Sequence, residues 1–175
     1  KPSMRKDNEI TGGVPGGAYL CAPGGPNAYA YIYVQPMNTD MWRDFVTAIG
    51  REDLLADARY GDAKSRWEHR DALNALVREW TGARTKHEVM ETLGKAGVPC
   101  GATLDTAEIL DDPHLNARGQ VHTIEHKTRG RFRLPGCPVR LSASESPTTP
   151  PPLAGEHTAE VLGALLGLSS DDLAR

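Results

Sequence analysis

The N-terminal part of the chain contains a glycine-rich run that leads directly into an apolar segment. Four of the six residues at positions 12–17 are glycine, and Pro15 lies among them. Glycine adopts positive φ angles and leaves its amide groups accessible, whereas proline restricts how far the backbone can flex. We expect a hinged flap whose backbone can approach a ligand closely.

Two short segments after the glycine run are rich in aromatic and β-branched residues, which favours strands. They are residues 18–21 and 28–34, and the sequence Pro-Gly-Gly-Pro-Asn at 23–27 separates them. Two such segments joined by a turn predict a β-hairpin.

Apolar periodicity and capping residues predict helices in the middle of the chain. Three amphipathic helices are expected, bounded by residues 38 and 50, 65 and 81, and 85 and 97. The third starts at a capping box formed by Thr85 and Glu88. After a short apolar crossover at 98–102, two short helices are expected, from Asp105 and from Asp112–Pro113, and they close at Gly119.

The C-terminal third changes character twice. Residues 120–126 and 131–134 predict a second hairpin, and from Ser142 to Pro152 the composition becomes rich in Ser, Thr and Pro, which indicates an extended connector. A final amphipathic helix follows at 155–166, and Ser169 caps one more turn. A single amphipathic helix on such an arm needs a surface on which to dock.

These patterns predict an α+β fold: a small mixed domain with a β-hairpin at each end and helices between, plus an extended proline-rich arm and a C-terminal helix. We expect a linker and glycine loop at 1–17, the small domain at 18–141, and the arm with its helix at 142–175.

Composition excludes several classes of function. With 20 Lys and Arg against 23 Asp and Glu, the chain has no basic stripe for nucleic acid. It lacks both an apolar run of the roughly 20 residues that a membrane span requires and a signal peptide, so we expect a cytoplasmic protein. It begins with Lys rather than Met, which suggests a processed or truncated piece of a longer protein.

The cysteines and histidines give no pattern of a metal or disulfide site. Cys21, Cys100 and Cys137 are widely spaced, so we expect reduced thiols, at least two of them in the core. His122 and His126 would share one exposed strand face, without a carboxylate or cysteine at ligand spacing, so no metal site is predicted.

Other candidate chemistry has simpler explanations. The pairs Asp111–Asp112 and Asp171–Asp172 would lie at helix starts, where carboxylates favour the positive end of the helix dipole. The sequence has no nucleophile signature, and Cys100 is interpreted as an inert buried thiol. Neither a dinucleotide fingerprint nor a phosphate-binding loop is present. From the residues alone, the glycine run is either a functional loop or a loose entry to the first strand.

Six segments, taken together and in order, resemble the class III CoA-transferases, the CaiB/BaiF family. They are GGVPGG at 12–17 with YLC at 19–21, IGREDL at 49–54, DARY at 57–60, GVPCG at 97–101, DPH at 112–114 and LAGEHT at 153–158. The glycine run is most similar to that of the formyl-CoA transferase branch. The resemblance covers nearly all of the chain and corresponds to the second half of a family member, its small domain and C-terminal arm.

The resemblance implies a homodimer of interlocked chains, each with a large Rossmann-like domain beside the small one. It implies an acyl-CoA and a small carboxylate as substrates, with no permanently bound cofactor. An aspartate of the large domain attacks the acyl-CoA, giving a mixed anhydride and then an aspartyl-CoA thioester, from which CoA passes to an acid such as oxalate. In such enzymes the glycine loop closes over this site.

Residue by residue, the match carries over Gly12, Gly13 and Gly16 as substrate-binding positions. Ile10 and Thr11 stand where the formyl-CoA transferase loop has two further glycines. Because no segment resembles the large domain, no catalytic nucleophile is assigned in this chain, and we expect it to be inactive alone. Two alternatives stay open: a fragment of a family acyl-CoA racemase, and a non-enzymatic interaction module that docks through its C-terminal helix.

Overall fold

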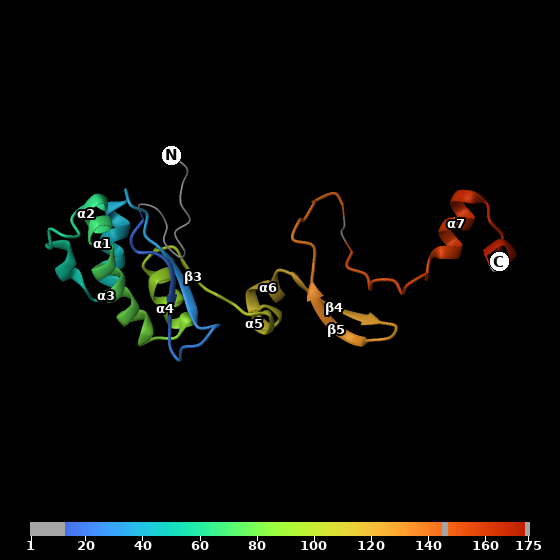
Figure 1. Cartoon of the computed structure of the whole chain (residues 1–175), viewed down its shortest axis with the longest axis horizontal. Helices are drawn as coiled ribbons and strands as arrows, with labels where there is room; N and C mark the ends of the chain where they lie inside the picture. Colours follow the sequence, from blue (N-terminus) through green and yellow to red (C-terminus); the bar gives the residue numbers. More distant parts are fainter. Residues whose placement is uncertain (1–12, 145–146, 174–175) are drawn as a thin grey trace. The chain divides into compact units, whose positions relative to one another are not determined.

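The computed structural model describes residues 13–144 and 147–173. The chain divides into two compact units, Lys1–Asp105 and Thr106–Arg175, which are described separately below. Figure 1 shows the first unit in blue to green and the second in yellow to red. An α+β fold with two small antiparallel sheets confirms the predicted class.

The first unit is built on a three-stranded antiparallel sheet of order β1-β2-β3. Its strands are β1 (Gly16–Leu20), β2 (Tyr29–Tyr33) and β3 (Cys100–Ala102). The predicted first hairpin is confirmed, with Ala18 opposite Tyr31, although β1 begins inside the glycine run. The expected crossover contains β3, which pairs Cys100 with Ile32; three residues are too short for a periodic strand signal.

Helices of the first unit are α1 (Thr39–Ala48), the 3-10 helix η1 (Glu52–Leu55), α2 (Ala63–Glu68), α3 (Arg70–Gly82) and α4 (Lys86–Lys95). Asn38 caps α1 as predicted, by accepting from the Met41 amide, and Gly50 after its end has φ 71°. The prediction of one helix over 65–81 is wrong. His69 leaves the helical conformation, with φ −104° and ψ 22°, and separates α2 from α3.

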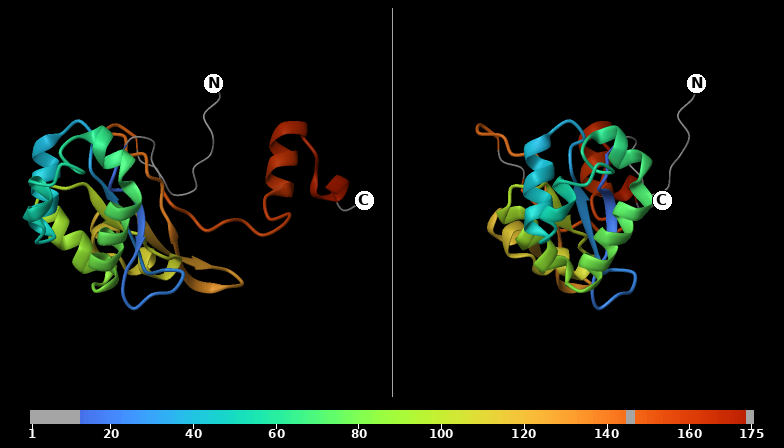
Figure 2. Two further views of the ribbon diagram at one scale, coloured as in Figure 1. Left: turned by 60° about the vertical axis from the view of Figure 1, so that its left-hand side comes forward. Right: turned by 90° about the vertical axis from the view of Figure 1, so that its left-hand side faces the viewer.

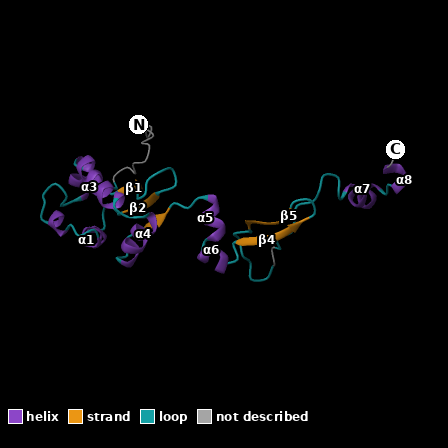
Figure 3. Cartoon of the chain, turned by 90° about the horizontal axis from the view of Figure 1, so that it is seen from below, coloured by secondary structure: helices purple, strands orange, loops and turns teal. Residues whose placement is uncertain are grey.

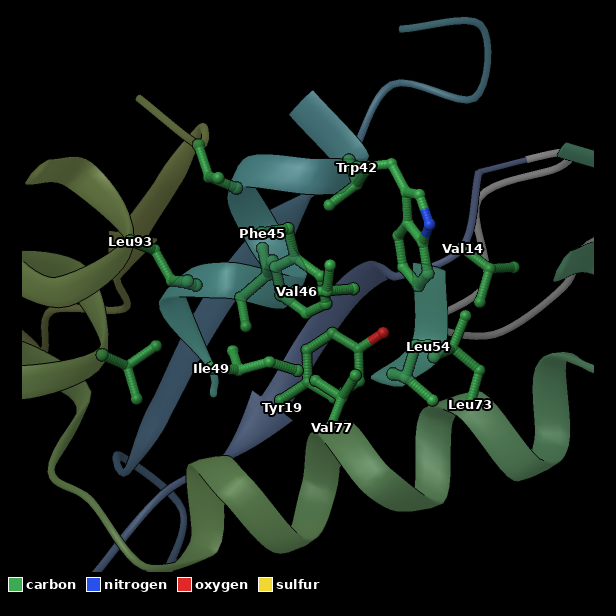
Figure 4. Close-up of a cluster of buried hydrophobic side chains, with 14 of the residues drawn as sticks. Val14, Tyr19, Trp42, Phe45, Val46, Ile49, Leu54, Leu73, Val77 and Leu93 are labelled. Carbon is green, nitrogen blue, oxygen red and sulfur yellow. The ribbon is translucent and has the colours of Figure 1, made fainter. Parts of the chain in front are cut away.

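The helices pack on one face of the sheet and form the core with it. α3 contacts β1, and α4 contacts β2 and β3. The right-hand view of Figure 2 looks onto α1 and α3, with the strands behind them. Figure 4 shows Tyr19 of β1 among Phe45, Val46 and Val77 of the helices. The Tyr19 hydroxyl donates to Asn74 Oδ1 at 2.7 Å, so this buried polar group is satisfied.

The predicted capping box at the start of α4 is present. The Glu88 amide donates to Thr85 Oγ1 at 3.2 Å, and the Glu88 carboxylate accepts from the Thr85 amide at 2.7 Å. This bond lowers the pKa of the Glu88 carboxyl group. We predict that Thr85→Ala lowers the free energy of unfolding by about 1 kcal/mol, measured by urea denaturation. Thr47→Ala, on the exposed side of α1, is the matched control, and an equal loss in both variants would contradict the capping role.

The second unit contains α5 (Thr106–Asp111), α6 (Pro113–Ala117), β4 (Val121–His126), β5 (Gly130–Pro135), α7 (Thr158–Leu166) and α8 (Ser170–Leu173). The strands β4 and β5 form the predicted second hairpin, with Ile124 opposite Phe132 (Figure 3). Asp112 caps α6 with Pro113 in its first turn, and Ser169 and Asp172 form reciprocal bonds at the start of α8. These caps confirm the sequence predictions.

Two predictions for the second unit are wrong. Asp111 is the last residue of α5 rather than a helix start, and its carboxylate accepts from Arg133 Nη1 at 2.7 Å. His126 is buried rather than exposed, because its Nδ1 accepts from the amides of Thr128 and Arg129, each at 3.2 Å, in the hairpin turn.

Candidate functional site

The glycine run is packed against the core over the part that the structure describes. Gly12 lies outside the described residues, whereas Gly13, Val14 and Pro15 are buried. Figure 4 shows the Val14 side chain next to Leu54. The Pro15 carbonyl accepts from the Val34 amide at 3.0 Å. From Gly13 onward, the backbone is held by burial and by pairing with β2. The hinged flap stays a prediction.

Gly16 and Gly17 begin β1 and face opposite sides of the sheet. Gly16 pairs with Tyr33, and Gly17 pairs with the fully buried Ile32. Gly17 is itself buried and has φ 147°, a conformation that L side chains rarely adopt. Glycine is required at position 17 by the backbone, whereas Gly16 has no positive φ and is only partly buried.

The outer face of the sheet carries a surface that we call the tyrosine face. It consists of Gly16, Ala18, Leu20, Tyr29, Tyr31 and Tyr33, which the antiparallel register places side by side. Leu20 and Tyr31 are 44% and 43% exposed, so two apolar side chains of this face are open to contact. Figure 1 shows α1 and α3 on the other side of the strands. The predicted substrate-binding Gly16 thus borders an aromatic, half-exposed surface that can contact an apolar or acyl group.

A buried arginine fixes the loops next to this sheet, and sequence reasoning missed it. Arg66 is 2% exposed, and its guanidinium donates to the carbonyls of Tyr60 and Pro36 at 3.1 and 2.9 Å. It also lies 4.8 Å from the centre of the Trp42 ring. Burial lowers the pKa of the Arg66 guanidinium. Its role is structural: two carbonyl dipoles and the face of an aromatic ring stabilise the buried charge.

A second buried cation secures the other end of the hairpin. Lys86 is 7% exposed, and its ammonium group donates to the carbonyls of Asn27 and Thr103, each at 2.9 Å. These bonds tie the turn between β1 and β2 to the residue that follows β3. The turn between β1 and β2 is therefore fixed to the end of β3 through the Lys86 side chain.

The cysteines differ in their surroundings. Cys21 lies in the core, Cys100 is half-buried against it, and Cys137 is exposed. Burial raises the pKa of the Cys21 and Cys100 thiols, which disfavours their reactive thiolate forms. Within residues 13–144 and 147–173, no group of three or more His, Cys, Asp or Glu side chains could hold a metal ion. No helix in these residues is long and apolar enough to cross a membrane.

Comparison with known proteins gives the family. The model of CoA-transferase family III matches residues 2–158. The chain belongs to this family. Among curated relatives of this family III chain, the formyl-CoA:oxalate CoA-transferase of Streptomyces avermitilis is 40% identical over 169 residues, which is 97% of this chain and 41% of the relative. The same enzyme of Streptomyces coelicolor is 40% identical over 97% of this chain and 40% of its own length.

Solved structures agree with the family III assignment. A CaiB/BaiF family protein from Brucella suis has a TM-score of 0.70 at 26% identity, covering 94% of this chain and 41% of that one. Rv3272 from Mycobacterium tuberculosis shares the fold, with a TM-score of 0.66 at 23% identity over 83% of this chain and 40% of that one. The predicted resemblance is confirmed, and the chain spans about 40% of the length of the curated relatives it matches.

Proposed function

We propose that this chain is the small-domain portion of an acyl-CoA transferase that moves CoA from an acyl-CoA to a carboxylic acid, of the formyl-CoA:oxalate type. One observation carries the proposal: 40% identity extends over 97% of the chain to a formyl-CoA:oxalate CoA-transferase, of which it spans 41%. An identity of 40% over nearly the whole chain supports a shared reaction as well as a shared fold. The remaining length of the relative would hold the large domain.

The nucleophile in this proposal is an aspartate outside the chain. Its carboxylate attacks the thioester carbonyl of the acyl-CoA and releases CoA thiolate, leaving a mixed anhydride. The thiolate then attacks the aspartyl carbonyl, which gives an aspartyl-CoA thioester and frees the first acid. The acceptor carboxylate repeats these steps in reverse order and leaves with CoA.

In this proposal the chain contacts the substrate and shields it from water, and it takes no part in the covalent steps. Gly12, Gly13 and Gly16 would line the substrate, with backbone amides close to the acyl group, and the tyrosine face would exclude water from the anhydride. The run is anchored from Gly13 onward, so closure would come from movement of the whole unit. Exposed apolar side chains on α7, Val161, Leu165 and Leu166, would dock on the large domain in an interlocked cytoplasmic homodimer.

A chimera tests this proposal. We predict that the Streptomyces avermitilis enzyme, with its matching segment replaced by this chain, converts formyl-CoA and oxalate to oxalyl-CoA and formate, followed by liquid chromatography. The chain alone is expected to give no turnover, because it lacks the nucleophile.

Two outcomes would overturn the proposal. Turnover by the purified 175-residue chain would show that the chemistry lies within it. A folded chimera that is inactive with formyl-CoA and oxalate, while the control chimera below is active, would contradict the transferase assignment. A parallel chimera made with the matching segment of the Streptomyces coelicolor enzyme controls for the effect of grafting.

A further inference from the structure

A cavity of about 350 Å³ in the second unit lies apart from the glycine run and the tyrosine face in sequence. Its polar lining comes from the start of β4 and from the loop after β5: His122, Cys137, Arg140 and Ser144. The Gly136 amide donates to the Gln120 carbonyl at 2.8 Å, which holds this loop against the start of β4. A bridge between Leu141 and Ser144 closes the loop on itself. The cavity walls are thus tied together by backbone bonds.

Two glycines make room for the two nitrogen-rich side chains of the cavity. A Cβ at Gly136 would collide with the His122 imidazole, so the ring lies directly on the glycine backbone. Nη2 of Arg140 lies 2.8 Å from the position that a Cβ of Gly119 would take, and Gly119 has φ 59°. A side chain at position 136 would displace the imidazole, whereas at position 119 the positive φ itself disfavours any residue other than glycine.

The Cys137 thiol of this cavity donates to the Val139 carbonyl at 3.5 Å, whereas the two nitrogen-rich side chains have no acceptor in the described part of the chain. Neither Arg140 nor His122 makes a hydrogen bond or ion pair there, and the cavity lining formed by these residues includes no carboxylate. A guanidinium carries five N–H donors and a permanent charge. Ser144 adds a hydroxyl group, and Val139 and Leu141 add apolar walls. A guanidinium with an imidazole and a hydroxyl beside it is the donor set that binds carboxylate and phosphate oxygens.

We propose that this cavity binds a small oxyanion, a carboxylate or a phosphate group, through Arg140, His122 and Ser144. Its volume lies in the range of small-molecule sites, about 300–1,000 Å³. The proposal does not depend on the CoA-transfer function, because all of its residues lie in the second unit and none was assigned to the substrate by the family match.

Cys137 provides a reporter inside the cavity. Its thiolate displaces iodide from anionic iodoacetate or neutral iodoacetamide and forms a carbon–sulfur bond, so the ratio of the two rates reports the local charge. At low ionic strength we expect this ratio to be about threefold higher in the folded chain than in urea, by electrostatic attraction of the anion. Arg140→Gln should remove the difference. Peptide mapping by mass spectrometry gives each rate, with Cys100 as an internal reference.

The control is Arg129→Gln, which removes the same charge from the hairpin turn at the far end of β4 and β5. A ratio at Cys137 equal to that in urea, or unchanged by Arg140→Gln, overturns the proposal. An equal drop in both variants also overturns it, because net charge alone would then explain the effect.

Protection experiments identify the source of the oxyanion. Inorganic phosphate, oxalate and CoA, each compared with chloride at equal ionic strength, are expected to slow the alkylation of Cys137 by iodoacetamide. Protection by CoA at tenfold or more lower concentration assigns the site to the phosphates of CoA, whereas equal protection by phosphate or oxalate assigns it to a free anion. No protection by any of the three contradicts binding.

Discussion

Replacing Arg66 with methionine is expected to lower the free energy of unfolding of the first unit by about 3 kcal/mol. Methionine keeps most of the buried apolar volume but donates no hydrogen bonds. The carbonyls of Tyr60 and Pro36 would lose their donor, and the Trp42 ring would lose its cation. A buried acceptor left unsatisfied costs about 1–3 kcal/mol, so the two losses dominate the result.

Tryptophan fluorescence during urea denaturation measures this effect directly, because all three tryptophans belong to the first unit. Arg78→Met is the matched control: Arg78 lies exposed on α3, and its loss should change stability by less than about 0.5 kcal/mol. A similar small change for Arg66→Met would show that the buried guanidinium does not stabilise the fold.

Local signals in the sequence predicted the N-terminal ends of several helices correctly. Asn38, Thr85, Asp112 and Ser169 each cap the helix that the sequence assigned to them, because a cap is decided by residues within one turn. The same reasoning failed for Asp111, which continues α5 and pairs with Arg133 on a distant strand. Only tertiary structure brings these two residues together.

Features that depend on tertiary packing were not predictable. The interruption at His69 carries no Gly or Pro, so the apolar periodicity of 65–81 runs through it without a break. Arg66 occupies a position that periodicity alone assigns to solvent, yet it is buried against Trp42. A single arginine on an amphipathic helix gives no sequence signal that tells a buried side chain from an exposed one. Its partners are backbone carbonyls from other segments.

The candidate site was predictable in part. The alternation of Tyr29, Tyr31 and Tyr33 is a strand signal that also defines one face, and it could have identified the tyrosine face before the structure. The burial of residues 13–15 could not be predicted from the sequence. That burial depends on the Val34 amide and on Leu54, which are both distant in the chain.

Alanine at position 17 is expected to destabilise the first unit by about 2 kcal/mol, whereas alanine at position 16 should leave stability within about 0.5 kcal/mol. Gly17 has φ 147° and faces the core opposite Ile32, so a Cβ there adds backbone strain in a closed space. Gly16, its neighbour in β1, does not share this positive φ and faces outward, opposite Tyr33. Urea denaturation followed by tryptophan fluorescence measures both variants.

The same pair of variants separates structure from function in the chimeric enzyme. If Gly16 borders the substrate, Gly16→Ala should lower kcat/KM about tenfold, because a methyl group on the tyrosine face displaces the acyl group from its reacting position. Its melting temperature should stay that of the parent chimera, whereas Gly17→Ala should lower it. Unchanged kcat/KM in Gly16→Ala would remove Gly16 from the site and leave Gly12 and Gly13 as the predicted substrate contacts. Equal losses of stability at both positions would show that the two faces of β1 are packed alike, and the tyrosine face would then lose its role as the surface presented to substrate.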